Sequence, residues 1–291
     1  ACSAPFLAPE ELVALKRDCT FWTWERGEKS YQIHYLERGQ GPHHLLFVHG
    51  YGGYSYSWRH QVDFFAARGY HVWAIDLLGF GWSDKPIDEE YSLPLYREQV
   101  ISFIEEMGLG KVHLVGHSMG GAIALAVGLE EGDRLLSLTL LAPVAYPMDL
   151  PLLFAVGKHF KEVATPLFTR KLLERGLHQI FFDRQLVTEE LIEKYWLPYR
   201  VEGGREAAIG VLQGFDRERL EAQAPRYPTL SLPLLLVWGA QDRSVPPSHL
   251  ERFQGEVPHA EQALFEACGH APHEEYPERF NRLLFTFLQK G

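Results

Sequence analysis

Cysteine and long apolar runs are both scarce in this chain. Its 291 residues include three cysteines, Cys2, Cys19 and Cys268, an odd number that is too small for a disulfide framework in a chain of this length. No stretch reaches the roughly 18 uninterrupted apolar residues that a membrane-spanning helix needs. The sequence therefore argues against a disulfide-stapled scaffold and against a protein that crosses a membrane on a helix.

Basic residues are also in deficit. The chain carries 28 Lys and Arg against 38 Asp and Glu, a formal net charge of −10. Because nucleic-acid binding depends on clustered Lys and Arg, we expect no nucleic-acid partner. With 46% hydrophobic and 23% charged residues, the composition is that of an ordinary globular protein. An enzyme that acts on a small molecule fits this composition.

The compartment is indicated mainly by absences. Without a secretory apolar segment or a disulfide framework, the default expectation is a cytoplasmic protein. The alternative is that Ala1-Cys2 is the remnant of a lipoprotein cleavage site. In that case the protein is exported, or anchored to lipid through Cys2.

Short apolar segments rich in β-branched and aromatic residues alternate with helical patterns along most of the chain. Strands buried on both faces and alternating with helices form a mostly parallel sheet with helices on both sides. We therefore predict a doubly wound α/β fold with residues 1–142 and 229–291 as its core. The expected strands are 44–49, 70–75, 112–115, 137–141, 234–238 and 262–266, with 31–37 pairing antiparallel at one edge, and the expected helices include 56–68, 93–107 and 118–131.

The segment 143–228 interrupts this alternation. It contains helical patterns at 161–176, 188–196 and 205–215, several prolines, and no convincing core strand. We predict a helical cap inserted between core strands. Such a cap would lie over the carboxyl end of the sheet, where open α/β sheets bind their ligands.

One serine lies in a sequence context typical of a nucleophile. Residues 116–121 read Gly-His-Ser-Met-Gly-Gly and stand between a predicted strand and a predicted helix. In a G-x-S-x-G turn the serine sits on a sharp strand-to-helix bend with its hydroxyl exposed. The glycines permit the close backbone approach that this bend requires. Ser118 is therefore the candidate nucleophile.

An acid and a base follow Ser118 in the order Ser, Asp, His. Asp242 comes just after the predicted strand 234–238, and His270 comes just after the strand 262–266. Carboxyl ends of parallel strands lie at one edge of the sheet, so the three side chains are expected to meet. A serine hydroxyl becomes a strong nucleophile when an imidazole takes its proton and a carboxylate fixes the imidazole's tautomer.

Other residues could supply the same groups. His273 is an alternative base, and Asp149 and Asp216 are alternative carboxylates. A metal site at His270 and His273 lacks a third ligand and the H-E-x-x-H spacing. Neither a dinucleotide fingerprint nor a phosphate-binding loop is complete in the sequence. We therefore expect no metal and no cofactor.

The glycine-rich turn after the first long strand, His49-Gly50-Tyr51-Gly52-Gly53, is a candidate oxyanion hole. Its donors would be the backbone N–H groups of Tyr51 and Met119. Tyr54, Tyr56 and His117 are candidates for substrate contact. The cap is rich in aromatic residues, which either line an apolar pocket or pack the cap onto the core; these are Phe154, Phe160, Phe168, Phe181, Phe182, Tyr195 and Trp196.

Four motifs therefore occur together: His49-Gly50, the segment 76–86 (Asp-Leu-Leu-Gly-Phe-Gly-Trp-Ser-Asp-Lys-Pro), the serine turn, and Gly269-His270 followed by Glu274 and Pro277. With these motifs the chain resembles the α/β-hydrolase superfamily, in its branch of capped serine esterases, carbon–carbon hydrolases and epoxide hydrolases. The resemblance covers nearly the whole chain outside the cap and the first 20 residues. It implies a nucleophile–acid–base triad of Ser118, Asp242 and His270.

The resemblance also narrows the reaction. Epoxide hydrolases and haloalkane dehalogenases of this fold need an aspartate where this chain has Ser118. Carbon–carbon hydrolases of ring-cleavage products usually carry a Trp directly after the histidine, where this chain has Ala271. We therefore predict a carboxylic ester hydrolase that acts through an acyl-enzyme on a small-molecule ester or lipid-like substrate. The alternatives are a carbon–carbon bond hydrolase of vinylogous diketones and a triad-bearing ligand-binding protein with little turnover.

Overall fold

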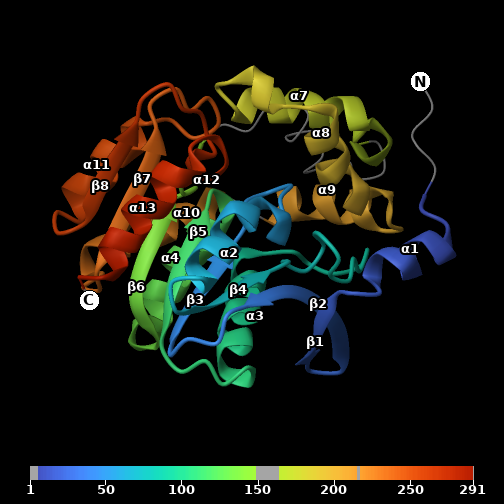
Figure 1. Ribbon diagram of the computed structural model, residues 1–291, viewed down its shortest axis with the longest axis horizontal. Helices are drawn as coiled ribbons and strands as arrows, with labels where there is room; N and C mark the ends of the chain where they lie inside the picture. Colours follow the sequence, from blue (N-terminus) through green and yellow to red (C-terminus); the bar gives the residue numbers. More distant parts are fainter. Residues whose placement is uncertain (1–5, 149–163, 215–216, 291) are drawn as a thin grey trace.

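The computed structural model describes residues 6–148, 164–214 and 217–290. These residues form an eight-stranded sheet in the order β1-β2-β4-β3-β5-β6-β7-β8 (Figure 1). From β4 to β8 neighbouring strands run parallel, whereas β2 pairs antiparallel with both β1 and β4. This confirms the predicted α/β class. The strands are β1 Thr20–Arg26, β2 Lys29–Arg38, β3 His43–Val48, β4 Tyr70–Ile75, β5 Val112–His117, β6 Leu135–Leu141, β7 Leu234–Gly239 and β8 Glu261–Phe265.

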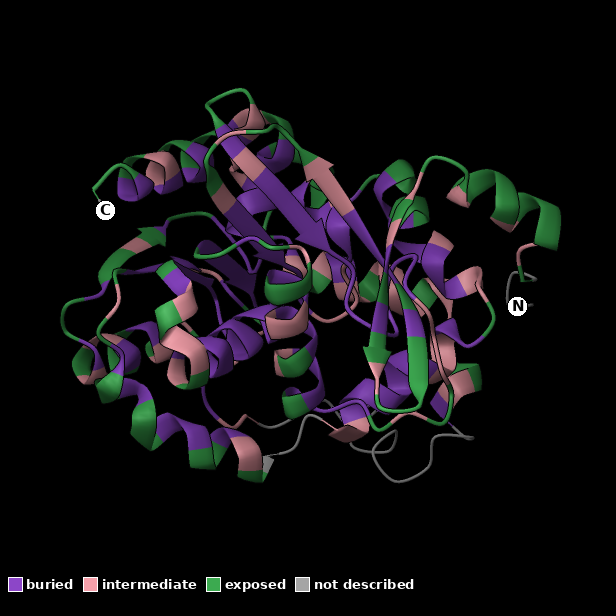
Figure 2. Cartoon of the chain, turned by 90° about the horizontal axis from the view of Figure 1, so that it is seen from below, coloured by how far each residue is buried: buried purple, intermediate pink, exposed green. Residues whose placement is uncertain are grey.

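Helices cover the sheet on both faces, and each face has its own apolar cluster. One cluster includes Phe103 of α3 (Leu93–Glu106) and Ile123 of α4 (Met119–Glu131). The other includes Phe65 of α2 (Arg59–Ala66) and Leu284 of α13 (Pro277–Leu288). Every residue of β5 and of β7 is buried, and Figure 2 shows the central strands as buried ribbons between partly exposed helices. Because helices cover both faces of these strands, the sequence of each strand is a nearly continuous apolar run.

Two local expectations need correction. The helix expected at 56–68 begins as a 3₁₀ turn, Ser55–Trp58, and becomes α-helical only over Arg59–Ala66. The strand expected at 31–37 does pair antiparallel, but β1 pairs on its other side and occupies the edge of the sheet. Burial explains the extra strand, because Trp22 and Trp24 of β1 turn the same face towards the core.

The insertion lies between β6 and β7, as predicted. Its described helices α7 (Arg170–Ile180), α8 (Glu189–Trp196) and α9 (Gly204–Gly214) lie beyond one end of the sheet (Figure 1). Where one helix was expected over 161–176, the described part holds a 3₁₀ turn, Thr165–Leu167, and a separate α7 whose first turn is capped by the Thr169 hydroxyl. α10 (Arg217–Gln223) and a 3₁₀ helix, Ala224–Thr229, lead back to β7.

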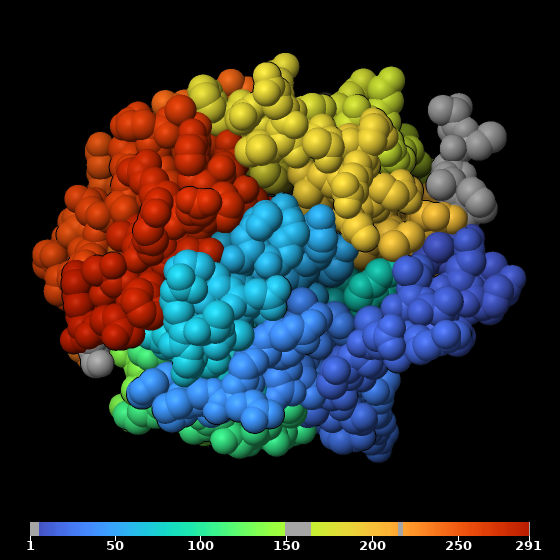
Figure 3. Space-filling model, viewed as in Figure 1, coloured from blue at the N-terminus to red at the C-terminus, as the bar shows by residue number. Residues whose placement is uncertain are grey.

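The remaining helices flank these elements. Among the described residues, the other α-helices are α1 (Pro9–Lys16), α11 (Ser248–Glu256) and the short α12 (Pro272–Glu275) that follows the histidine loop. On the face seen in Figure 3, the insertion lies between the C-terminal segment and the N-terminal segment of the chain. No helix of the described residues is long and apolar enough to span a membrane.

Candidate active site

Ser118 lies in the bend between β5 and α4. Its backbone has φ 55° and ψ −116°, a conformation that residues with a side chain rarely adopt. The bend is tight because its glycines touch other backbone. A Cβ on Gly116 would lie 2.4 Å from the Gly120 carbonyl oxygen, and one on Gly120 would lie 2.3 Å from the Val48 carbonyl oxygen. The glycine pattern of the sequence therefore reflects the space that this bend leaves.

Asp242 and His270 reach Ser118 from the loops that follow β7 and β8. His270 Nε2 lies 2.8 Å from Ser118 Oγ, and His270 Nδ1 lies 2.7 Å from Asp242 Oδ2. The other oxygen, Asp242 Oδ1, accepts hydrogen bonds from the backbone N–H groups of Ser244 (2.7 Å) and Val245 (2.9 Å). The structure thus brings together the three side chains that the sequence selected.

This arrangement has a definite polarity. A carboxylate only accepts hydrogen bonds, so Asp242 Oδ2 places the ring proton of His270 on Nδ1. Nε2 is then left as the acceptor for the Ser118 hydroxyl. All three side chains are buried, with Ser118 8% and His270 4% exposed. Chemically, the set can move the serine proton to the imidazole while Oγ attacks a carbonyl carbon.

The turn after β3 lies directly against Ser118. A Cβ on Gly50 would lie 3.0 Å from Ser118 Cβ. His49 shapes this turn, because its Nε2 accepts the Leu77 N–H (2.9 Å) and its Nδ1 donates to the Gly50 carbonyl oxygen (2.8 Å). Burial lowers the pKa of His49, which keeps the ring neutral for this pair of bonds. The use of the Tyr51 and Met119 N–H groups as an oxyanion hole stays a prediction.

His117 contacts His270 rather than pointing away from it. Its Nε2 donates to the His270 carbonyl oxygen over 2.8 Å, and its ring centroid lies 4.8 Å from that of His270. Burial, together with the nearby His270, holds the pKa of His117 well below its usual value. A neutral His117 therefore supports the backbone of the histidine loop. Its contact with a substrate stays a prediction.

The tyrosines near the turn join the core to the insertion. The Tyr51 hydroxyl donates to the Ala208 carbonyl oxygen of α9 (3.0 Å), and the Tyr54 hydroxyl donates to the Lys194 carbonyl oxygen of α8 (2.9 Å). Tyr56 stacks on Tyr54 with ring centroids 5.7 Å apart. Substrate contacts of Tyr54 and Tyr56 also stay predictions.

Four of the described aromatic residues of the insertion are buried in apolar clusters. Phe168 and Trp196 are buried in one apolar cluster, and Phe181 and Tyr195 are buried in another. Phe182 is instead 41% exposed. The other residues considered in this segment, Phe154, Phe160, Asp149 and Asp216, lie outside the described residues.

His273 occupies a different position from His270. Its ring stacks on Trp58 with centroids 4.3 Å apart, and neither of its nitrogens has a hydrogen-bond partner among the described residues. The geometry therefore favours His270 as the base. Within the described ranges, no group of three or more His, Cys, Asp or Glu side chains is arranged to hold a metal ion.

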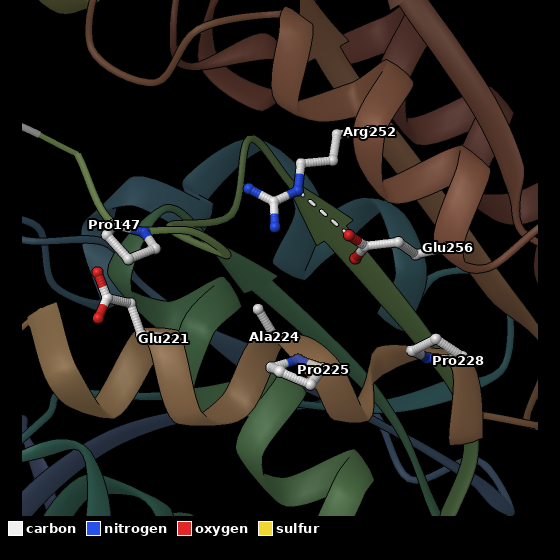
Figure 4. A pocket seen from close by; sticks show the side chains of 7 residues that line it. All are labelled: Pro147, Glu221, Ala224, Pro225, Pro228, Arg252 and Glu256. Carbon is white, nitrogen blue, oxygen red and sulfur yellow. Dashed lines mark hydrogen bonds and ion pairs between the residues drawn. The ribbon is translucent and has the colours of Figure 1, made fainter.

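A cavity of about 500 Å³ lies away from these groups (Figure 4). It lies between the segment after β6, α10 with the 3₁₀ helix after it, and α11, and the Arg252 guanidinium in its wall bonds Glu256 over 3.2 Å. No triad residue lines it. The lining residues are Pro147, Glu221, Ala224, Pro225, Pro228, Arg252 and Glu256.

One residue near His270 was missed in the sequence. The family motif drew attention to Glu274, yet it is the next residue, Glu275, whose carboxylate accepts the Gly269 N–H over 2.6 Å. Its signal was weak, because two adjacent glutamates in a short helix look alike in sequence. Only the direction of each side chain separates them.

Comparison with known proteins covers nearly the whole chain. Residues 43–277 match the family model described as alpha/beta hydrolase fold. The chain is 31% identical over 279 residues to a 2-hydroxy-6-oxo-6-phenylhexa-2,4-dienoate hydrolase of Burkholderia cepacia. This alignment covers 92% of this chain and 94% of the relative. It is also 31% identical to a 2-hydroxy-6-oxononadienedioate/2-hydroxy-6-oxononatrienedioate hydrolase of Comamonas testosteroni, again over 92% and 94%.

The chain is also similar to a solved structure of a hydrolase. The chain superimposes on a meta-cleavage product hydrolase of Pseudomonas fluorescens with a TM-score of 0.77 and 25% identity, over 89% of this chain and 95% of that one. The similarity therefore includes both the sheet and the region inserted between β6 and β7.

Proposed function

The chain belongs to the α/β-hydrolase fold family, and we propose that, as a serine hydrolase of this family, it cleaves a carbon–carbon bond next to a ketone in a vinylogous diketone. The observation that carries the proposal is the similarity to two hydrolases of 2-hydroxy-6-oxo-dienoates along almost the full length of both chains. This replaces ester hydrolysis, the reaction favoured by the sequence alone, as the leading candidate.

The proposed reaction uses the hydrogen-bonded set described above. Ser118 Oγ attacks the ketone carbon while its proton passes to His270 Nε2, and the backbone N–H groups of Tyr51 and Met119 stabilise the oxyanion. The dienol reacts as its keto tautomer, in which the carbon next to the attacked ketone is saturated. The bond between these two carbons then breaks, its electron pair enters the vinylogous enolate, and His270 returns the proton to the leaving carbon. Water that is deprotonated by the same imidazole releases the carboxylic acid from the acyl-enzyme. Asp242 holds the ring orientation throughout.

Ester hydrolysis is the second candidate, and one residue favours it. The carbon–carbon hydrolases that the sequence resembles usually have a Trp after the histidine, whereas Ala271 is a small and fully buried side chain here. An ester needs the same nucleophile, base and oxyanion donors, but its leaving group is an alkoxide rather than a carbanion.

The two candidates are separated by one panel of substrates. We would measure kcat/KM for 2-hydroxy-6-oxo-6-phenylhexa-2,4-dienoate beside p-nitrophenyl esters from acetate to laurate. The proposal expects the dienoate to exceed the best ester by at least about 10²-fold. The reverse order would replace it with the esterase.

Wild type and Ser118→Ala would be compared on every substrate and with a fluorophosphonate that labels activated serines. The variant should lose at least about 10³-fold in rate and should not be labelled. A wild-type protein with neither turnover nor labelling would overturn both candidates and leave a ligand-binding protein.

A further inference from the structure

The insertion makes a direct backbone contact with the loop that carries the base. The His270 N–H donates to the carbonyl oxygen of Ile180, the last residue of α7, over 2.8 Å. Gly269 lies so close that a Cβ there would be 2.2 Å from the same oxygen and 2.8 Å from the Phe182 nitrogen. The histidine loop is therefore held between the insertion on one side and His117 on the other.

A single buried carboxylate bridges the same two segments. Glu275 Oε1 accepts the Gly269 N–H (2.6 Å), and Oε2 accepts the N–H groups of Phe182 (2.8 Å) and Asp183 (3.2 Å). The thiol of Cys268 lies 3.7 Å from Oε1. Glu275 is 8% exposed, so its carboxylate accepts hydrogen bonds from the protein backbone and is largely shielded from water.

Such a group is costly to bury. Burial raises the pKa of Glu275 above its ordinary value, while the backbone N–H groups partly oppose the shift. The carboxylate instead has three backbone donors, of which two belong to the insertion and one to the residue next to His270. Because a carboxylate has two acceptor oxygens, Glu275 can bond to the insertion with one oxygen and to the histidine loop with the other.

We propose that Glu275 is a positioning residue for His270, and that through it the insertion fixes the base against Ser118. The inference rests on the proposed role of His270 as the base. With Glu275 in place, the Cys268–Gly269 peptide cannot rotate without breaking the hydrogen bond from the Gly269 N–H to Glu275. Displacement of residues 180–183 would move the imidazole out of line with Ser118 Oγ, and a shift of about 1 Å can cost about 10² in rate.

The neighbouring glutamate supplies a matched control. Glu274 is equally buried and also contacts the insertion, since its Oε1 accepts a hydrogen bond from the Tyr195 hydroxyl (2.6 Å). Its Oε2 accepts a hydrogen bond from the Arg59 guanidinium of the core (2.6 Å). Neither oxygen of the Glu274 carboxylate bonds to residues 268–270 in the part of the chain that the structure describes. A role limited to anchoring the insertion would therefore affect both positions alike, whereas a role in positioning His270 belongs to Glu275 alone.

The test compares Glu275→Gln with Glu274→Gln in the full chain. A glutamine at 275 has one oxygen, so its amide NH₂ must face either Gly269 or the pair of insertion N–H groups. We expect kcat and the rate of fluorophosphonate labelling to fall together by about 10²-fold, with KM changed less than about threefold. Glu274→Gln should instead label within about threefold of wild type.

Equal losses in the two variants, or no loss at Glu275, would overturn the inference. If Glu275→Gln does not fold, Glu275→Asp keeps the charge but shortens the reach, and wild-type labelling in that variant would equally overturn it. His270→Ala separates the two proposals. If this variant is labelled as fast as wild type, His270 is not the base. If His270→Ala loses labelling but Glu275→Gln does not, only the positioning role of Glu275 is refuted.

Discussion

Asp242→Asn should leave the fold intact and remove most of the activity. The two carboxylate oxygens have different partners, with Oδ1 accepting the N–H groups of Ser244 and Val245 and Oδ2 facing His270 Nδ1. An asparagine has one side-chain oxygen, and this oxygen keeps the hydrogen bonds from the Ser244 and Val245 N–H groups. Its NH₂ group then faces His270 and donates to Nδ1, which moves the ring proton to Nε2. The imidazole can no longer accept the proton of Ser118.

The size of the effect follows from these bonds. The opposite amide orientation would leave two backbone donors unpaired, at about 1–3 kcal/mol each, so the inactive tautomer dominates. We expect kcat to fall by about 10⁴-fold, or ~5 kcal/mol in the barrier.

Fluorophosphonate labelling and turnover of the best substrate measure this loss, and thermal unfolding checks the fold. Asp149→Asn, at the alternative carboxylate outside the described residues, is the control and should label like wild type. An Asp242→Asn protein that keeps more than a tenth of the wild-type labelling rate would refute the reasoning.

Three further predictions concern stability. Burial opposes the charge on His34, but its ion pair with Asp76 raises the pKa of His34 to about 9 from 6.5. This contribution, about 3 kcal/mol, is complete below pH 6.5 and disappears as the pH rises to 9. Urea unfolding across this range should therefore show a decline that His34→Gln lacks, and parallel curves would contradict the pairing. Gly120→Ala should abolish soluble folding because its Cβ would overlap the Val48 carbonyl oxygen, whereas Gly132→Ala, with no atom within 4 Å, should unfold like wild type in the same thermal scan. Tyr54→Phe, which loses the bond to Lys194, should lower the free energy of unfolding by about 1 kcal/mol, whereas an unchanged urea midpoint would argue that this bond adds no stability.

The core was predictable because its signals are local. A strand buried on both faces is mostly apolar, so β5 and β7 could be placed within one or two residues. The edge strand β1 was missed because it lies outside the parallel core and alternates its burial. Helix starts were less accurate, since the 3₁₀ turn at Ser55–Trp58 and the following α-helix share one apolar pattern.

Part of the site was predictable for a topological reason. Parallel strands end at one edge of the sheet, so Ser118, Asp242 and His270 could be expected to meet before any distance was known. Their hydrogen bonds of 2.7 and 2.8 Å agree with that expectation. The sequence alone placed ester hydrolysis first, because the triad is common to several reactions and Ala271 departs from the carbon–carbon hydrolases.

Sequence by itself therefore determined the α/β class, the place of the insertion, and which three side chains meet at the candidate site. Only the tertiary structure decided how the insertion meets the loop that carries His270. Phe182 and Glu275 are 93 residues apart, and the insertion contributes backbone N–H groups, which every residue except proline possesses. A contact made by backbone on one side has no residue type to mark it in sequence, so folding alone distinguishes Glu275 from Glu274.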